Sequence, residues 1–410
     1  PTRIALMTGQ YPFRNGWINH WDVPRWGGGA HFDWKVNPSV ARALQNAGYK
    51  TAVAGKWQVN DFRVQPEAMR HHGFDDYCMW TGYEAGNPPS HERYWDPYIH
   101  TRDGSKTYHG QFGEDIFADF LIDFMQAHRG EPIFLYYAMC LPHTPFVTTP
   151  LEPDAEGRLG KHKAMVRYAD HIIGELVNAI EELGLREDTL IIVTTDNGST
   201  GSITGTRHGH RVKGAKTKTT EAGTAVPFII SQPGTVPEGT VSYALCDITD
   251  MLPTFTDLAG TTPDDCYPYD GHSLKDVFHG RSRDGPREWI LAMGGHNNAR
   301  LTNRGIENQW YFRDRVIRNQ RYKLWVSTGR QPLKFYDLKN DPWEENNLID
   351  DPAMAGEIAK LFAPIQEQPR KDNDPIYVPL DPEPWDVDIT AQSQAWKSGQ
   401  PQAADVQGSD

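Results

Sequence analysis

Short apolar runs alternate with amphipathic stretches over the first two-thirds of the chain, and this alternation is the feature that most constrains its fold. The runs that predict strands cover residues 49–54, 132–139, 190–195 and 226–231. The stretches with apolar residues at helical spacing cover residues 39–47, 115–127 and 165–183. Such alternation is typical of parallel sheets covered by helices. We therefore expect an α/β fold with a mostly parallel central sheet flanked by helices.

The pattern changes after about residue 285. Further strands are predicted at residues 315–317, 322–326 and 333–338, and a helix at 353–362. The last residues are rich in Pro, Asp, Gln and Ser, which indicates an extended or disordered tail. We expect an α/β domain over 1–285, a small antiparallel sheet with a helix over 286–370, and a tail over 371–410.

Composition places the chain among globular proteins and excludes some partners. Of its 410 residues, 38% are hydrophobic and 23% charged, which is typical of folded proteins and not of disordered ones. Its net charge of −13 argues against a general affinity for nucleic acid. No apolar run approaches the roughly 18 residues that span a bilayer. The four cysteines form no CxxC pair and do not fix the compartment. We expect no nucleic-acid partner and no membrane span.

Asp196, Asn197 and Gly198 directly follow the predicted strand at 190–195. In open α/β sheets, ligands bind beyond the carboxyl ends of strands. A carboxylate beside an amide carbonyl offers two hard oxygen ligands, which suit calcium or magnesium. Asn-Gly is also a strong turn signal, so a plain turn is the competing interpretation.

Residues 207–218 reverse the acidic character of the chain. This segment contains Arg207, His208, His210, Arg211, Lys213, Lys216 and Lys218. Lys and Arg donate charge-assisted hydrogen bonds to sulfate, phosphate or carboxylate oxygens. The segment is therefore either an anion pocket or a solvated loop.

His143 and Lys56 follow two other predicted strands. His143 comes after the strand at 132–139 and could act as a general acid or base, or simply as a hydrogen-bonded structural residue. Lys56 follows the strand at 49–54 and could reach a ligand or lie on the surface. Because parallel strands end at one edge of a sheet, we expect these residues to meet Asp196 and the basic segment there.

Several ordered motifs resemble the sulfatase family within the alkaline-phosphatase-like superfamily. The family signature is a Cys or Ser, any residue, Pro, Ser or Thr, Arg, a spacer and Leu/Met-Thr-Gly, and the opening PTRIALMTG matches it from the Pro onward. The further similar segments are Gly55-Lys56-Trp57, Asp196-Asn197-Gly198 and residues 216–227, with weaker ones at 250–260, 270–274 and 336–348. The resemblance covers the chain to about residue 365.

The resemblance implies a sulfuric ester hydrolase that uses a formylglycine nucleophile and Ca²⁺, with Mg²⁺ less favoured. Asp196 and Asn197 would be metal ligands, and Arg3 would hold the formylglycine. Lys56 and Lys216 would bind sulfate oxygens, and His143 would contact the ester and could protonate the leaving oxygen. The candidate substrate-binding residues are Gln58, His210, Trp21 and Trp26. A formylglycine-generating or sulfatase-maturing enzyme would be a partner.

Three departures from the family pattern concern catalysis. The nucleophile, formed from Cys or Ser, would stand two positions before Pro1, so we expect a truncated chain without sulfatase turnover. The family's first strand, with its pair of Asp ligands, would also lie upstream. Gln58 stands where the family usually has His, and an amide carries no proton at neutral pH. Gln10, where Arg is common, is a smaller departure.

The substrate interpretation depends on residues 17–34, which include Trp17, Trp21, Trp26 and Trp34. These rings could stack on a sulfated carbohydrate, or could anchor a loop in the core. The expected partner is a small or oligosaccharide sulfate ester. Two other functions stay open: a phosphodiesterase or phosphonate monoester hydrolase of the same superfamily, and a non-catalytic relative that binds sulfated glycans. By analogy with the family, the protein would be periplasmic or secreted.

Overall fold

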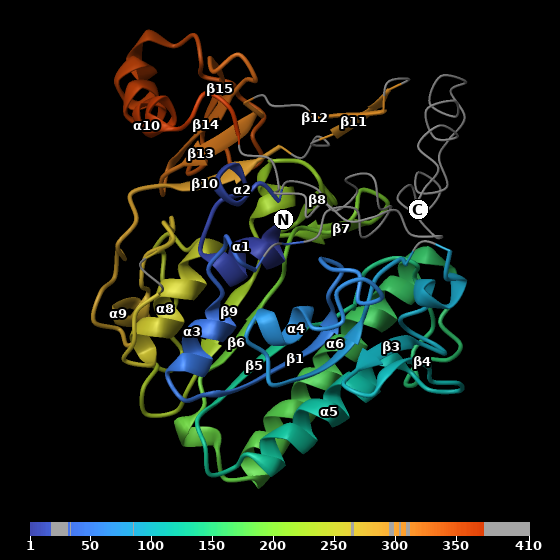
Figure 1. The fold of residues 1–410 in the computed structure, drawn as a ribbon. Helices are drawn as coiled ribbons and strands as arrows, with labels where there is room; N and C mark the ends of the chain where they lie inside the picture. The colour runs from blue at the N-terminus through green and yellow to red at the C-terminus, as the bar shows by residue number, and fades with distance from the viewer. Residues whose placement is uncertain are drawn as a thin grey trace. The chain divides into compact units, whose positions relative to one another are not determined.

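The computed structural model describes residues 1–17, 32, 34–84, 86–263, 266–294, 299–302, 305–308 and 312–372 (Figure 1). The chain divides into two compact units. Unit 1 comprises Pro1–Asn19, Leu190–Asn298 and Gln309–Pro375, and unit 2 comprises His20–Thr189, Ala299–Asn308 and Ile376–Asp410. The division at residues 285 and 370 stays a prediction. All but the first two residues of the predicted tail lie outside the described residues.

Unit 2 contains a five-stranded mixed sheet with the strand order β4-β3-β2-β1-β5. Its strands are β1 (Lys50–Lys56), β2 (Asp76–Trp80), β3 (Tyr98–Thr101), β4 (Gly104–Thr107) and β5 (Ile133–Ala138). β1 pairs in parallel with β2 and β5, whereas β3 and β4 extend the sheet by antiparallel pairing. Ala52, Val53 and Ala54 of the central strand β1 are fully buried, as expected for a parallel strand covered on both faces. The carboxyl ends of β1, β2 and β5 therefore lie at one edge of this sheet.

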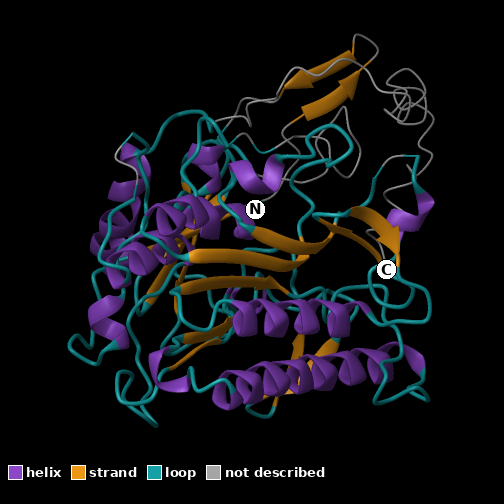
Figure 2. Cartoon of the chain, turned by 60° about the horizontal axis from the view of Figure 1, so that its bottom comes forward, coloured by secondary structure: helices purple, strands orange, loops and turns teal. Residues whose placement is uncertain are grey.

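Helices pack on this sheet within unit 2. They are α3 (Val40–Asn46), α4 (Ala68–His71), α5 (Gly113–Ala127) and α6 (Gly157–Glu182), with the 3₁₀ helices η1 (Pro88–His91) and η2 (Arg186–Asp188). The long helices α5 and α6 lie side by side (Figure 2). Phe117 and Leu121 of α5 join Trp80 of β2 and Met165 of α6 in one core cluster. A hairpin of β11 (Ala299–Thr302) and β12 (Gly305–Asn308) also belongs to this unit.

Unit 1 begins with the signature segment and contains two small antiparallel strand pairs. The helices of this part are α1 (Thr2–Thr8), α2 (Pro12–Asn15), α7 (Glu221–Thr224), α8 (Met251–Leu258) and α9 (Lys275–Phe278), with the 3₁₀ helix η3 (Ile248–Asp250). The strand pairs are β6 (Ile191–Thr194) with β9 (Phe228–Ser231), and β7 (Thr204–Arg207) with β8 (His210–Lys213). Ile192, Phe228 and Ile230 pack with Met251 and Phe278 in a second cluster.

The rest of unit 1 is a four-stranded antiparallel sheet with a helix. Its elements are β10 (Ile290–Met293), β13 (Arg315–Arg318), β14 (Tyr322–Val326), β15 (Pro332–Asp337), the 3₁₀ helix η4 (Pro352–Met354) and α10 (Ala355–Glu367). Leu361 and Ile365 of α10 pack on Ile317, Leu324 and Phe335 of the sheet. In Figure 1 this sheet and α10 are orange to red.

The fold class predicted from the sequence is confirmed: a central sheet is flanked by helices, and a small antiparallel sheet with a helix follows. The structure adds that β6 and β9 pair with each other in antiparallel fashion, so the parallel part of the described sheet is β2-β1-β5. Helix α6 begins at Gly157, eight residues before the predicted start. Hydrophobic periodicity missed these first turns because residues 157–164 carry no apolar stripe. No helix in the described residues is long and apolar enough to cross a bilayer.

Candidate functional site

The end of strand β1 holds Lys56 through a close backbone contact. Gly55 pairs with Ala138 of β5 and has a φ of 89°. A Cβ atom at Gly55 would collide with the Ala138 carbonyl oxygen, so only glycine fits there. Trp57, the next residue of the motif, is 2% exposed and donates from Nε1 to Asn60 Oδ1 at 3.1 Å. The close contact at Gly55 and the buried ring of Trp57 thus fix the backbone of Lys56 from both sides.

Two cationic side chains share the ring of Trp80 at the end of β2. Lys56 Nζ lies 5.8 Å from the ring centroid, and the guanidinium carbon of Arg93 lies 4.6 Å from it. Arg93 is 2% exposed and donates from NH1 to Tyr83 Oη at 3.1 Å. Its NH2 lies 3.3 Å from His143 Nδ1. Arg93 therefore links the predicted residues Lys56 and His143 within unit 2.

His143 lies in a tightly held loop that follows β5. Tyr94 Oη lies 2.7 Å from the carbonyl oxygen of Cys140 and 2.6 Å from that of His143. The ring atom Nδ1 of His143 also lies 2.7 Å from the Thr144 carbonyl oxygen. When Nδ1 carries a proton, it can donate to the Thr144 carbonyl. When Nδ1 is unprotonated, it can accept from Arg93. The protonation of Nδ1 therefore decides which of the two hydrogen bonds forms.

Glu114 supports the same loop from the first turn of α5. Its Oε1 accepts from the Leu141 amide at 2.9 Å, and its Oε2 accepts from Tyr137 Oη. The carboxyl group is fully buried. Burial raises its pKa to about 7, against the opposing effect of the Tyr137 hydroxyl and the backbone amides of Leu141 and Cys140.

Gln58 is buried beside the same strand end. It is 3% exposed, has a φ of 56°, and its Cγ packs against Gly82, where a Cβ atom would come within 2.6 Å. Its Oε1 has no hydrogen-bond donor among the described residues. This orphaned acceptor is consistent with a ligand-binding role, which stays a prediction.

In unit 1, a hydrogen bond joins the signature helix to the predicted metal ligands. Thr2 of α1 donates from Oγ1 to the Asp196 carbonyl oxygen at 2.9 Å. Arg3, the next residue of α1, is half-buried. Asp196 is exposed and Asn197 half-buried in the turn after β6. The structure thus brings the helix that carries Arg3 to the turn that carries Asp196.

Glycines bring the loop of Lys216 to the same turn. The Gly198 amide donates to the Gly223 carbonyl at 2.9 Å, and a Cβ at Gly198 would collide with the Ala222 carbonyl oxygen. The Lys216 amide donates to the Ser199 carbonyl at 2.9 Å. The glycine at 198 is therefore required by the close approach of the two backbone segments. This approach places the half-buried Lys216 beside the residues that follow Asn197.

The Asp196-Asn197 turn offers part of a site for a hard cation. The Asp196 carboxylate has no hydrogen bond or ion pair to any other described residue, and Asn197 donates from Nδ2 to the Gly198 carbonyl at 3.3 Å, which leaves its Oδ1 as an acceptor. Calcium takes six to eight oxygen ligands. No group of three His, Cys, Asp or Glu side chains in the described residues could hold a metal. The donor atoms suit calcium, but these two residues supply only part of a ligand shell.

The basic segment 207–218 divides into an exposed hairpin and the Lys216 loop. Arg207, Arg211 and Lys213 are exposed on β7 and β8. His210 is also exposed, and its ring centroid lies 4.9 Å from that of Trp343. The exposed hairpin thus fits the interpretation as a solvated loop, whereas the Lys216 amide donates to Ser199, the residue that follows the Asp196-Asn197-Gly198 turn.

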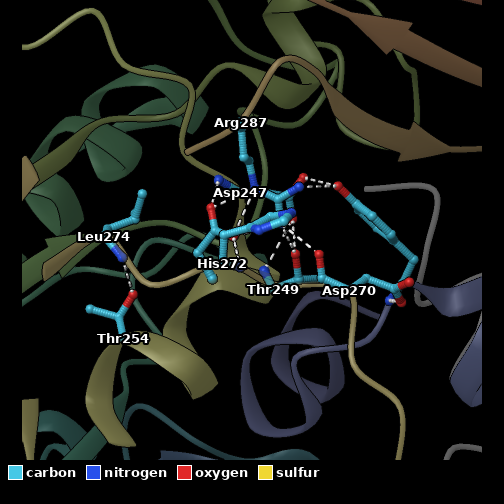
Figure 3. A network of polar contacts seen from close by, with 9 residues as sticks. Asp247, Thr249, Thr254, Asp270, His272, Leu274 and Arg287 are labelled. Carbon is cyan, nitrogen blue, oxygen red and sulfur yellow. Dashed lines mark hydrogen bonds and ion pairs between the residues drawn. The ribbon is translucent and has the colours of Figure 1, made fainter. Parts of the chain in front are cut away.

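A buried polar network fixes the chain just after the signature (Figure 3). Arg287 is paired with Asp250 at 2.5 Å and donates to Tyr11 Oη at 3.3 Å. Tyr11 in turn donates from Oη to Asp247 Oδ2 at 3.0 Å. The Tyr11 amide donates to Asp270, which also pairs with Arg14 at 2.7 Å. Burial and the nearby Asp247 raise the pKa of the Tyr11 hydroxyl far above its ordinary value.

The two described tryptophans of residues 17–34 pack against other residues, Trp17 buried and Trp34 half-buried. Trp17 is 3% exposed. Trp34 stacks on His71, with 4.5 Å between the ring centroids and 7° between the planes. For these two rings the structure favours the anchoring interpretation. Trp21 and Trp26, the two predicted substrate contacts, lie outside the described residues.

Comparison with known proteins identifies the family. The sulfatase family model matches residues 1–261, and a model described as N-sulphoglucosamine sulphohydrolase, C-terminal, matches residues 215–371. This chain belongs to the sulfatase family. The family recognised from the motifs is thereby confirmed.

Individual sulfatases match at moderate identity. The N-acetylgalactosamine-6-sulfatase of Canis lupus familiaris is 29% identical over 400 residues, with 90% of this chain and 69% of that protein covered. The Homo sapiens enzyme of the same name is 30% identical over 315 residues, which cover 70% of this chain and 58% of that protein. An arylsulfatase of Hemicentrotus pulcherrimus is 28% identical over 300 residues, 68% of this chain and 52% of that protein. The chain thus spans between half and about two-thirds of these curated relatives.

Solved structures share the fold of this sulfatase-family chain. The crystal structure of Ps i-CgsB aligns with a TM-score of 0.75 at 20% identity, with 99% of this chain and 88% of that chain covered. The structure of BT4656 in complex with its substrate D-glucosamine-2-N,6-O-disulfate aligns with a TM-score of 0.66 at 20% identity, covering 90% of this chain and 87% of that chain. These likenesses support the α/β architecture described above.

Proposed function

We propose that the protein hydrolyses sulfuric esters and releases inorganic sulfate. The observation that carries this proposal is the sulfatase match over residues 1–261, because it spans the motif residues from Arg3 to Lys216. The positions of those residues support it. In unit 2, Lys56 and His143 follow the ends of β1 and β5. In unit 1, backbone contacts bring the helix of Arg3 and the loop of Lys216 to the turn that carries Asp196 or to the residue after it.

The basic residues would bind and orient the sulfate group. Lys56 and Lys216 would donate charge-assisted hydrogen bonds to its oxygens. Arg3, on the helix whose Thr2 contacts the Asp196 backbone, would orient the nucleophile. His143 would hold the ester oxygen from Nε2, since its Nδ1 faces Arg93 and the Thr144 carbonyl. A proton carried on that nitrogen would pass to the leaving alcohol.

Two groups would complete this chemistry. A formylglycine, derived from a Cys or Ser upstream of Pro1 by a maturing enzyme, would supply the nucleophile. A Ca²⁺ ion, held in part by the Asp196 carboxylate and Asn197 Oδ1, would offset negative charge on the sulfate group. Gln58 would accept a hydrogen bond from the ligand through its unpaired Oε1 and would take no part in proton transfer.

We further propose a sulfated carbohydrate as the substrate. Support comes from relatives: the matched enzymes include N-acetylgalactosamine-6-sulfatases. Ps i-CgsB has been crystallised with k-i-k-neocarrahexaose, and BT4656 with D-glucosamine-2-N,6-O-disulfate. His210, Trp21 and Trp26 stay candidate contacts to the sugar.

The test uses a protein that carries the proposed Cys or Ser two positions before Pro1. Sulfate release from sulfated monosaccharides should exceed phosphate release from the matching phosphate esters, and K56A and H143A should each lower kcat/KM at least a hundredfold. K163A, which removes an exposed lysine of α6, is the control and should leave the rate unchanged. Faster turnover of phosphate esters would instead favour a phosphoesterase, and absence of turnover with retained glycan binding would favour a non-catalytic relative.

A further inference from the structure

Arg93 is a buried cation without a carboxylate partner in the described residues. Its contacts are the Tyr83 hydroxyl, His143 Nδ1 and the faces of Trp80, Tyr83 and Tyr94. Its Nε is buried and has no hydrogen-bond acceptor there. Burial of a charge is unfavourable unless an opposite charge compensates it.

Other buried arginines of the chain do have such partners. Arg287, whose side chain is 2% exposed, is paired with Asp250 at 2.5 Å. Arg315 is fully buried and is paired with Asp372 at 2.6 Å. Arg93 thus departs from the way this protein otherwise accommodates a guanidinium. A requirement for positive charge at its position explains the difference better than packing, because a methionine or leucine would fill an aromatic cage without the cost of desolvation.

The surroundings of Arg93 indicate what that charge faces. The Trp80 ring that holds Arg93 also lies next to Lys56 Nζ, and Arg93 NH2 touches the ring of His143. Three groups able to carry positive charge therefore gather at the carboxyl ends of β1, β2 and β5. Like charges repel one another, so this arrangement is favourable when an anion binds to it.

We propose that Arg93 is a positioning residue that supplies a fixed positive charge behind Lys56 and His143 and thereby strengthens the binding of a sulfate group at this edge of the sheet. Its side chain is 2% exposed, so it acts through the His143 ring and the Trp80 face and not by touching the ligand. This inference rests on the proposed roles of Lys56 and His143, which the experiment tests separately.

The experiment is isothermal titration calorimetry of the chain with sodium sulfate. R93M, which keeps the bulk and removes the charge, should weaken sulfate binding about tenfold or more, the size expected for a charge about 10 Å away at an effective dielectric constant of about 20. R93K keeps the positive charge but lacks the planar N–H donors of the guanidinium. Its affinity for sulfate should stay within about threefold of that of the unaltered chain. R102M removes an exposed arginine just after β3 and should have no effect. If R93M does not fold, R93Q provides the neutral variant.

The outcomes separate this inference from the proposed function. Sulfate affinity of R93M or R93Q equal to that of the unaltered chain would overturn the inference, and so would equal weakening in R93K and R93M, because a structural role does not depend on charge. If K56M and H143Q lose binding while R93M keeps it, the proposed sulfate site stands and the role of Arg93 falls. If the unaltered chain binds no sulfate, or if none of these variants changes its affinity, both proposals are contradicted.

Discussion

Gly55 shows how a single atom can decide the position of a functional side chain. Lys56 follows it directly, and the backbone of β1 reaches that point only because no Cβ separates it from the Ala138 carbonyl. The positive φ of 89° at Gly55 adds a second reason for glycine. In G55A the two strands must separate or the backbone must change its conformation.

We expect G55A to lower the free energy of unfolding by about 2–4 kcal/mol, since strain and lost packing in a core typically cost that much. G130A is the matched control, because a Cβ at Gly130 meets nothing within 4 Å and its φ is not positive. Urea denaturation followed by circular dichroism measures both. A G55A chain as stable as G130A would show that the close contact has no energetic consequence.

Glu114 gives the stability of the chain a pH dependence. Its pKa of about 7 in the folded state lies above the value of 4.5 expected for an unfolded glutamate. Below pH 4.5 both states are protonated and its contribution to stability is complete. Between pH 4.5 and 7 the unfolded state loses its proton first, so the contribution falls, by about 3 kcal/mol in total.

E114Q should therefore remove part of the decline in stability between pH 4.5 and 7. Its amide carries no charge at any pH, and its carbonyl oxygen can still accept from the Leu141 amide. Urea midpoints measured at intervals across this range provide the slope. E156Q, at an exposed position, should keep the slope of the unaltered chain. Identical slopes for E114Q and the unaltered chain would contradict the assignment of this titration to Glu114.

At the scale of elements, the short helix α7 is held by a carboxylate that binds two cations. Glu221 accepts from Arg318 of β13 at 2.7 Å and from Lys323 of β14 at 2.9 Å. Lys323 is fully buried and is also paired with Glu344 at 2.8 Å. The loop that carries Lys216 leads directly into α7, so these contacts anchor it to the antiparallel sheet.

E221Q should loosen this anchor. We expect the free energy of unfolding to fall by about 2–3 kcal/mol, because hydrogen bonds to charged groups are lost and Lys323 keeps only Glu344. Tryptic cleavage after the exposed Lys218 should become faster, since the loop opens more often. E238Q, at an exposed site, serves as the control. Unchanged proteolysis in E221Q would show that α7 is held by other contacts.

Periodicity predicted the elements that bury an apolar face and missed those that do not. The stripe of α5 and the runs of β1 and β5 were sufficient, because tertiary packing agrees there with the local pattern. β3 (YIHT) and β4 (GSKT) are short and largely polar, and β7 and β8 lie in a basic segment, so none of them has the alternation of a strand. The early turns of α6 were missed for the same reason.

The site was predictable where backbone requirements shape the sequence. Lys56, Asp196 and Lys216 stand within two residues of glycines that the fold needs, so their motifs are visible in the chain. Arg93 could not be found in this way, because its importance comes from burial and from its contact with His143, 50 positions later in the chain. A run such as His91-Glu92-Arg93 has the composition of a solvated surface. Only the packed structure shows that its arginine is inside.

At the scale of the whole chain, the network around Arg287 joins the first residues to a much later segment. Arg287 contacts Tyr11 across 276 positions, and Tyr11 contacts Asp247 across 236. Asp250 is fully buried and Asp247 half-buried, and burial raises the pKa of Asp247 although Arg287 opposes this. The one guanidinium thus compensates carboxyl groups on which the anchoring of α1 and α2 depends.

R287M should lower the free energy of unfolding by about 3–5 kcal/mol, because it leaves Asp250 buried without its cation. R281M breaks an exposed ion pair with Asp276, whose side chains are 65% and 68% exposed, and should cost less than about 1 kcal/mol. Thermal melts of both variants and the unaltered chain compare these effects. Similar losses for the two would mean that the buried pair contributes no more than the surface pair.

The same long-range contacts set an order of events during synthesis. Helices α1 and α2 cannot take their final environment until residue 287 has left the ribosome, and at 5–20 residues per second the 276 positions from Tyr11 to Arg287 take roughly 15–60 s. Contacts between residues so far apart in sequence also make the search for the native topology slow. The signature segment is therefore made well before the residues that enclose it, which leaves it accessible to other proteins throughout that interval.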